Sequence, residues 1–177
     1  MSSLGDVEKW RSKIRNIPDF PKPGVNFKDI TPLLADAQAF GEVVDTIAGS
    51  FDAGGIEKVC GIEARGFILA APVAHRLGAG FVPIRKHGKL PYTAEAASYT
   101  LEYSEEVLEI HADALKPGER VLVVDDVLAT GGTAGAAGEL VQRLGARVEG
   151  FAFLVELGFL GGRARLDGYR LQSLICY

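Results

Sequence analysis

Short apolar runs alternate along the chain with segments in which apolar residues recur every three or four positions. The continuous runs predict strands that are buried on both faces of a sheet, since such strands have no exposed side for polar residues. They lie at 56–62, 80–84, 107–110, 120–125, 147–156 and 171–177. The periodic segments predict helices at 37–51, 67–77 and 133–144. This alternation predicts one α/β domain over 1–177, with a mostly parallel twisted sheet flanked by helices.

Three segments do not follow this pattern. Residues 4–14 predict a short amphipathic helix whose Trp10 packs on the domain, or else on a second subunit. Residues 20–30 are rich in turn formers and then become briefly extended. Residues 90–98 show no clear period and predict a long loop, and long loops in compact domains often act as lids.

The stretch 121–133 carries the strongest candidate chemistry. Four apolar residues precede the adjacent carboxylates Asp125 and Asp126, and a loop of small residues then runs into a predicted helix. The loop residues are Ala129, Thr130, Gly131, Gly132 and Thr133. Ligands of open α/β sheets bind at the carboxyl ends of strands, and N–H groups at a helix start attract phosphate. The stretch therefore predicts a ribose phosphate site, in which the carboxylates accept hydrogen bonds from the sugar hydroxyls.

A hard cation is expected beside this carboxylate pair. Asp125 and Asp126 would repel a polyanion unless a cation such as Mg²⁺ lies between them, bound through oxygen atoms and water. Arg65 follows a predicted strand end, and Lys86 and Lys89 follow the next one. These three cations could bind a second anionic group such as pyrophosphate, although each could equally belong to a solvated loop.

Composition narrows the classes of function. The 177 residues carry a net charge of −4, which argues against a general nucleic-acid binder. The two cysteines, distant in sequence, exclude a dense disulfide framework, and no apolar run is long enough for a membrane span. The dinucleotide, P-loop and GxSxG motifs are absent, and the three histidines lack metal-ligand spacing. We therefore expect a cytoplasmic protein that binds neither nucleic acid nor membranes.

The segment VVDDVLATGGT, residues 123–133, resembles the 5-phosphoribosyl-1-pyrophosphate (PRPP) binding motif of type I phosphoribosyltransferases. Further segments resemble the adenine branch of this family. They are FPKPGVNFKDITPLL (20–34), GIEARGF (61–67), PIRKHGKLP (83–91), SYTLEYSEEVLEI (98–110) and LVELGFLGGR (154–163). The resemblance covers nearly the whole chain and implies the type I phosphoribosyltransferase fold.

This resemblance implies the reaction of adenine and PRPP to AMP and pyrophosphate with Mg²⁺, in purine salvage, by a homodimer. It gives PRPP-binding roles to Asp125 and Asp126 (ribose), 129–133 (5-phosphate), Arg65, Lys86 and Lys89 (pyrophosphate), and Tyr103. It makes Glu102 the catalytic residue that exchanges a proton with the purine, within a flexible hood loop at about 85–103. It also implies that Phe27 and Leu157 sandwich adenine and that backbone near Val25 and Lys28 reads its edge. Residues 92–97 match no family motif.

Two other interpretations of the sequence remain open. The sandwich residues indicate a purine more firmly than adenine, so hypoxanthine or xanthine is an alternative substrate. A PRPP-sensing regulator on the same fold would also carry the central motif, but it needs an additional nucleic-acid-binding region, and this net acidic chain shows none. Phe27 itself, taken without the resemblance, could be a core anchor as well as the wall of an aromatic site.

Overall fold

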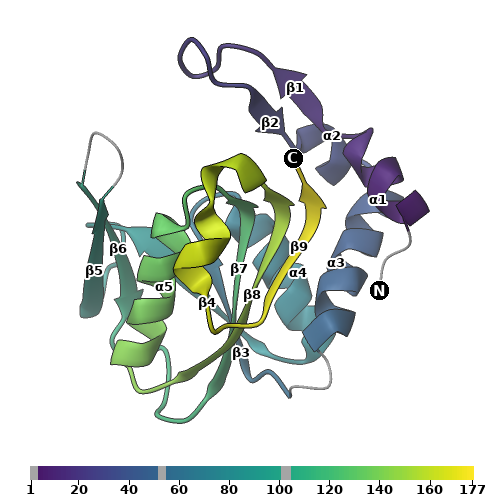
Figure 1. The fold of residues 1–177 in the computed structure, drawn as a ribbon. Coiled ribbons are helices and arrows are strands. Elements are labelled where there is room, and N and C mark those ends of the chain that lie inside the picture. The colour runs from purple at the N-terminus through teal and green to yellow at the C-terminus, as the bar shows by residue number, and fades with distance from the viewer. Residues whose placement is uncertain (1–3, 52–54, 101–104) are drawn as a thin grey trace.

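A twisted sheet forms the centre of the computed structural model, which describes residues 4–51, 55–100 and 105–177 (Figure 1). Its strands are β3 (Lys58–Ile62), β4 (Gly80–Lys86), β5 (Ala94–Thr100), β6 (Glu105–His111), β7 (Arg120–Leu128), β8 (Arg147–Glu156) and β9 (Leu171–Cys176). In the described part of the chain their order is β5-β6-β4-β3-β7-β8-β9. All neighbours from β4 to β9 pair in parallel, whereas β6 pairs antiparallel with both β4 and β5. The sheet is therefore mostly parallel, as the sequence predicts.

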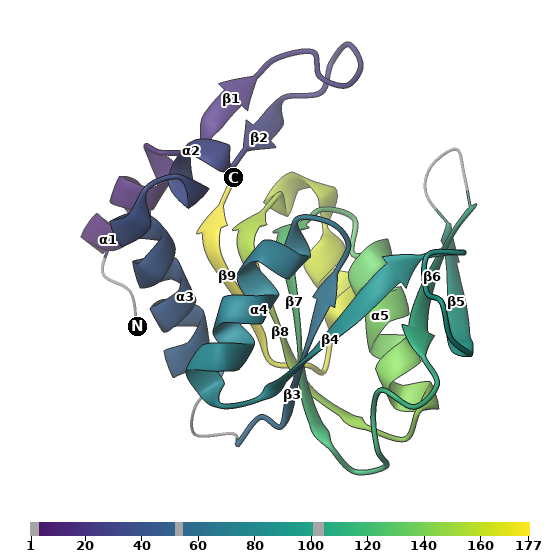
Figure 2. The same cartoon turned by 180° about the vertical axis from the view of Figure 1, so that it is seen from behind.

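Helices cover both faces of this sheet (Figures 1 and 2). They are α1 (Leu4–Arg11), α2 (Thr31–Leu34), α3 (Ala37–Phe51), α4 (Gly66–Leu77) and α5 (Gly132–Arg143), with the short 3₁₀ helices η2 (Gly158–Leu160) and η3 (Gly162–Leu166). The α3 and α4 helices pack on one face, and α5 packs on the other. The central strand β7 shows why both faces are apolar. Leu122 and Val124 pack beneath α3 and α4, while Val121 and Val123 face α5.

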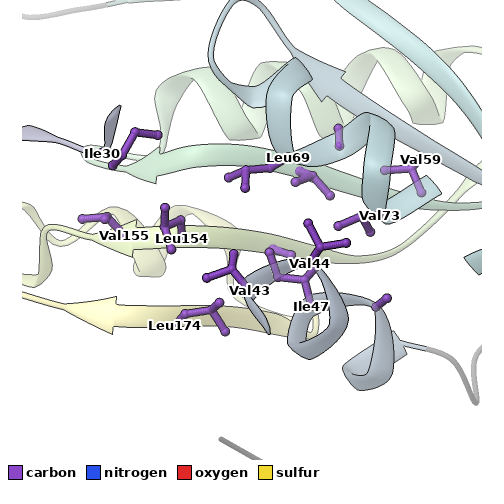
Figure 3. Packing of buried hydrophobic residues seen from close by; sticks show 14 of the residues in the cluster. Ile30, Val43, Val44, Ile47, Val59, Leu69, Val73, Leu154, Val155 and Leu174 are labelled. Carbon is purple, nitrogen blue, oxygen red and sulfur yellow. The ribbon is translucent and has the colours of Figure 1, made fainter. Parts of the chain in front are cut away.

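The larger of the two cores lies between α3, α4 and the sheet (Figure 3). Val43 of α3 lies between Leu154 and Leu174 of the sheet, and Val43 and Ile47 have no exposed surface. Trp10 of α1 joins this core with 1% of its surface exposed, and its indole N–H donates to Glu42 Oε2 over 3.1 Å. The prediction that Trp10 packs on the domain is confirmed.

A small ribbon stands apart from the sheet, beyond the carboxyl end of β9 and beside the C-terminus (Figure 1). It pairs β1 (Arg15–Ile17) with β2 (Phe27–Asp29) in antiparallel register. Phe27 therefore stands at the edge of the sheet where the parallel strands end.

Two segments differ from the sequence-based expectation. The predicted loop at 90–98 is a strand from Ala94 onward, because β5 pairs with β6 over its whole length and buries Ala97 against α5. Alanine and glutamate have low strand propensity, so tertiary pairing decided this element. The stretch 157–162, for which the sequence pattern predicts neither helix nor strand, contains η2 and the start of η3.

Candidate active site

The candidate site lies where β3 ends beside β7. Pairing between these strands ends at Gly61 and Val124, while β7 continues along β8 to Leu128. Asp125 and Asp126 therefore lie inside β7, because the strand continues three residues beyond its predicted end at Asp125. The pairing with β3 ends just before the two carboxylates, so β3 does not pair with β7 beside them. The geometry still leaves them at a carboxyl edge, where ligands of such sheets bind.

The carboxylates of Asp125 and Asp126 are adjacent, and burial and mutual repulsion make their negative charges unfavourable. Burial and the neighbouring Asp126 charge raise the pKa of Asp125 well above its usual value. Burial also raises the pKa of Asp126, although Arg65 opposes this effect. Gly66, at the start of α4, gives Asp125 its space, since a Cβ there would lie 2.6 Å from Asp125 Oδ1. Such a pair gains from a ligand that donates hydrogen bonds or brings positive charge.

Arg65 joins two predicted parts of the site. Its Nε lies 2.7 Å from Asp126 Oδ2, at ion-pair distance but without the alignment of a hydrogen bond. Its guanidinium carbon also lies 5.1 Å from the centroid of the Phe27 ring, within the range of a cation–π contact. The carboxylate predicted to face ribose and the ring predicted to face adenine are thus contacted by one side chain.

The small-residue loop after β7 is held against η3. Gly131 adopts φ +80°, a conformation that glycine takes without strain, and precedes the first residue of α5. A Cβ on Gly131 would lie 2.5 Å from the Gly162 carbonyl oxygen, and a Cβ on Gly162 would collide with the Ala129 carbonyl oxygen. The loop and η3 can therefore pack this closely only because both contact positions are glycine. Thr130 and Thr133 of the loop are partly buried.

A cavity of about 520 Å³ opens beside this loop. Tyr99 of β5, Gly131, Gly132 and Arg165 of η3 are among its lining residues. The Tyr99 hydroxyl donates to Glu106 Oε2 over 2.8 Å, and burial raises the pKa of Tyr99 to about 12. Tyr99 and Arg165 are not among the site residues predicted from the sequence. Tyr99 directly follows the predicted loop at 90–98, and it belongs to β5, a strand that begins inside that loop. Basic residues after a strand end were the signal that could have found Arg165.

The lysines predicted to bind pyrophosphate are already paired with acids. Lys86 Nζ lies 3.0 Å from Glu106 Oε2, and Lys89 Nζ lies 2.5 Å from Glu63 Oε1. Both lysine side chains remain about half exposed, at 51% and 46%. They stand on the β4 side of β3, whereas Asp125 and Asp126 stand on the β7 side. The two lysines and the two aspartates therefore lie on opposite sides of β3, the strand that Arg65 follows.

The residues predicted to face adenine come from both ends of the chain. Phe27 is partly buried, and its ring meets that of Phe20 edge to face at 5.2 Å. The Leu157 N–H donates to the Leu128 carbonyl over 2.9 Å, which places Leu157 beside the start of the phosphate-type loop. The Lys28 ammonium donates to Asn16 Oδ1 and lies over the Tyr177 ring. Val25 is partly buried before β2.

Two predicted residues, Glu102 and Tyr103, lie outside the described residues. In the rest of the predicted hood loop, residues 85–86 end β4 and residues 94–100 form the whole of β5, with the connection 87–93 between them.

Asp125 and Asp126 could supply only a minor part of the ligands of a magnesium ion. Asp125 and Asp126 supply the carboxylate oxygens that Mg²⁺ prefers, and their raised pKa values indicate that they would gain from a cation. Within the described residues, however, no group of three or more His, Cys, Asp or Glu side chains could hold a metal ion. Mg²⁺ would therefore take most of its ligands from substrate and water, as it usually does at phosphate sites.

Comparison with known proteins defines the class of protein to which this fold and site belong. The family model for the phosphoribosyl transferase domain matches residues 33–169, a range that contains β3 to β8 and the whole carboxylate–loop stretch. The chain is a member of the phosphoribosyltransferase family and an enzyme of that class, as the sequence predicts.

Individual relatives identify the branch. An adenine phosphoribosyltransferase of Acidothermus cellulolyticus is 59% identical over 92% of each chain. The crystal structure of an adenine phosphoribosyltransferase from Thermoanaerobacter pseudethanolicus, 50% identical, superposes with a TM-score of 0.94 over 97% of this chain and 99% of that one. The enzyme from Saccharomyces cerevisiae, crystallised with adenine and an imino-altritol bisphosphate, is 35% identical with a TM-score of 0.93, over 98% of this chain and 100% of that one. The chain belongs to the adenine phosphoribosyltransferases, and the predicted fold and family are confirmed.

Proposed function

We propose that this protein transfers the 5-phosphoribosyl group of PRPP to adenine, forming AMP and pyrophosphate in purine salvage. The single observation that carries the proposal is the position of Arg65, whose guanidinium contacts both Asp126 and the Phe27 ring. One side chain thus spans the distance between a sugar-binding carboxylate and a base-binding ring. The yeast relative crystallised with adenine and a bisphosphate supports the same pairing of ligands.

The sugar phosphate part of PRPP binds along β7 and α5. Asp125 and Asp126 accept hydrogen bonds from the ribose hydroxyls, which relieves their mutual repulsion. Backbone N–H groups and hydroxyls of the loop 129–133 hold the 5-phosphate at the start of α5, where the helix dipole favours an anion. The close contact between Gly131 and Gly162 supports this role, because it gives the loop a single shape.

The pyrophosphate part binds to Arg65, Lys86 and Lys89. Arginine can bind two phosphate oxygens at once, and each lysine adds a point charge. Asp125 and Asp126 are the residues that would hold a bound Mg²⁺, which would supply further positive charge to the leaving group. Neutralising the leaving group in this way stabilises a transition state in which the anomeric carbon gains oxocarbenium character.

Adenine binds between the ring of Phe27 and the side chain of Leu157, and the backbone near Val25 and Lys28 reads its edge. The ribbon β1–β2 supports this arrangement, since it carries Phe27 to the carboxyl edge of the sheet. Glu102 exchanges the proton of the purine ring, and Tyr103 contributes to PRPP binding. Closure of the segment 85–103 over both substrates excludes water, which would otherwise hydrolyse the activated sugar.

Assembly and location belong to the same proposal. A homodimer is supported by Ile68 of α4 and Phe81 of β4, which remain 44% and 38% exposed although they are large and apolar. Sedimentation velocity at micromolar concentration tests it, and a monomer would contradict it. No helix among the described residues is long and apolar enough to span a membrane. The cytoplasmic location stays a prediction.

The decisive experiment supplies PRPP and Mg²⁺ with one base at a time. We expect adenine to give AMP and pyrophosphate, with at least tenfold lower kcat/KM for hypoxanthine or xanthine. Preference for another purine would refute the adenine assignment. Binding of PRPP without conversion of any base would instead favour the regulator. A Glu102→Gln variant should lose turnover and keep PRPP affinity, and unchanged turnover would remove Glu102 from the mechanism.

A further inference from the structure

Glu63 is a largely buried carboxylate with no role in the reaction described above. It directly follows β3, and its side chain is only 9% exposed. Its Oε1 lies 2.5 Å from Lys89 Nζ, and its Oε2 accepts the Lys86 backbone N–H over 3.0 Å. Its Oε2 also lies 3.4 Å from Arg85 Nε. All these partners come from one segment, Arg85–Lys89, which carries both lysines proposed for pyrophosphate.

Glu63 stays ionised despite its burial. Burial alone would raise the pKa of Glu63, but the hydrogen bonds from Lys89, the Lys86 N–H and Arg85 together outweigh it and lower the pKa below its usual value. A buried charge is costly unless its partners satisfy both of its oxygens, and here both are satisfied. The arrangement is therefore specific for a carboxylate, since a neutral side chain of the same shape offers only one accepting oxygen.

The basic segment is otherwise held from the opposite side by β6. Glu106 pairs with Lys86, and Glu109 accepts the Gly88 N–H over 3.0 Å and lies 2.5 Å from His87 Nδ1. Glu63 is the acid that ties the segment to β3, among the residues that the structure describes. It stands two positions before Arg65, so one short turn fixes both Arg65 and the anchor of the lysines.

We propose that Glu63 is a positioning residue for the pyrophosphate group: it fixes Lys89 and the backbone of Lys86 beside Arg65, so that three cations form a preorganised anion site. This inference rests on the proposed function. The Lys89 ammonium has three N–H donors, and the 2.5 Å contact with Glu63 uses one of them. The other two remain for phosphate oxygens, so Lys89 binds Glu63 and pyrophosphate together. Preorganisation of this kind lowers the cost of ordering a long side chain on binding.

Glu63→Gln tests the role directly. Glutamine cannot accept hydrogen bonds from both Lys89 and the Lys86 N–H, so the segment loses one anchor. We expect the KM of PRPP and the KM of pyrophosphate in the reverse reaction to rise about tenfold, the effect of one lost hydrogen bond to a charged group. The KM of adenine and kcat should change less than twofold. Calorimetric titration with inorganic pyrophosphate should show the same loss of affinity.

Three further variants make the result specific. Glu57→Gln removes a carboxylate near the opposite end of the same strand, where Glu57 pairs with Arg120, and should leave both KM values unchanged. Glu63→Asp keeps two oxygens and should recover part of the pyrophosphate affinity. In a Lys89→Met background, Glu63→Gln should have a clearly smaller effect, because the two residues act through one contact. Additive effects would overturn the proposal.

Two other outcomes would also overturn it. Tighter pyrophosphate binding by Glu63→Gln would show that Glu63 only competes for the lysines. A Glu63→Gln variant that also loses kcat, adenine affinity and thermal stability to the same degree would show that Glu63 has only a structural role. Calorimetry separates this inference from the proposed reaction, since pyrophosphate affinity requires no turnover. A wild-type protein that binds pyrophosphate but converts no base would refute the reaction, and Glu63 would still be judged by calorimetry.

Discussion

Gly162 lies against the loop proposed to hold the 5-phosphate, and a single methyl group there would disturb this contact. A Cβ on Gly162 would collide with the Ala129 carbonyl oxygen and lie 2.8 Å from the Gly131 nitrogen. Both atoms belong to the backbone, so no flexible side chain can move aside. Gly162→Ala must therefore displace either the loop or η3.

The size of this effect follows from the geometry. Overpacking a tight contact costs about 1–3 kcal/mol. For a chain of this length, 1 kcal/mol corresponds to about 2–4 °C in the melting temperature, so we expect a loss of about 2–12 °C. Misplacing a binding group by about 1 Å can cost about 100-fold in rate or affinity. A shift of several tenths of an ångström should then raise the KM of PRPP about tenfold or more.

The neighbouring Gly161 supplies a matched control. It adopts φ +66° and has open space where its Cβ would lie. Gly161→Ala should cost about 1–2 kcal/mol through backbone strain alone and should leave the PRPP affinity unchanged. Calorimetric binding of PRPP and thermal melts of the two variants separate loss of stability from displacement of the loop. Unchanged PRPP affinity in Gly162→Ala, or an equal loss in Gly161→Ala, would refute the reasoning.

Three further predictions concern other residues of the protein. Asp125→Asn should gain about 0.5–2 kcal/mol of stability at pH 7 and lose PRPP affinity. The stability gain is expected because the raised pKa of Asp125 means that its ionised form destabilises the free protein increasingly as pH rises above 3.8. A destabilised variant in thermal melts would contradict this. Phe27→Ala should raise the KM of adenine at least about tenfold, with PRPP affinity nearly unchanged; equal loss of both in steady-state kinetics would count against the sandwich. Glu156, whose pKa the hydrogen bonds from Arg163 lower, contributes stability above its ordinary 4.5 that is lost as pH falls through the lower value. Glu156→Gln should cost about 1 kcal/mol of stability at neutral pH, a modest figure because Arg163 is half exposed. It should also weaken the loss of stability at acid pH. An unchanged pH dependence of unfolding would show that the Glu156–Arg163 pair does not contribute to stability.

Local patterns along the chain were sufficient to predict most of the fold. Strands such as β8 are continuous apolar runs, and helices such as α3 show clear periodicity, so both follow from burial alone. The antiparallel strand β5 could not be predicted in this way. Its first four residues, 94–97 (Ala-Glu-Ala-Ala), have low strand propensity, and pairing with β6 and packing on α5 stabilise them.

The carboxylate–loop stretch could be recognised from the sequence because all its parts are consecutive. Asp125, Asp126 and the loop 129–133 lie on one strand–turn–helix unit, so their spacing in the sequence is also their spacing in space. Residues distant in the sequence carry no such signal. Arg65 and Phe27 come from different elements, and only the tertiary structure brings the guanidinium onto the ring.

The sequence by itself determined which residues bear charge and which turns require glycine, because these properties belong to single side chains and to local backbone. The tertiary structure decided how the charges are shared. It pairs Arg65 with Asp126, Lys86 with Glu106, and Lys89 with Glu63, and none of these pairs is close in sequence. The physical reason is that parallel strands bring their carboxyl ends to one edge, where side chains from separate connections meet.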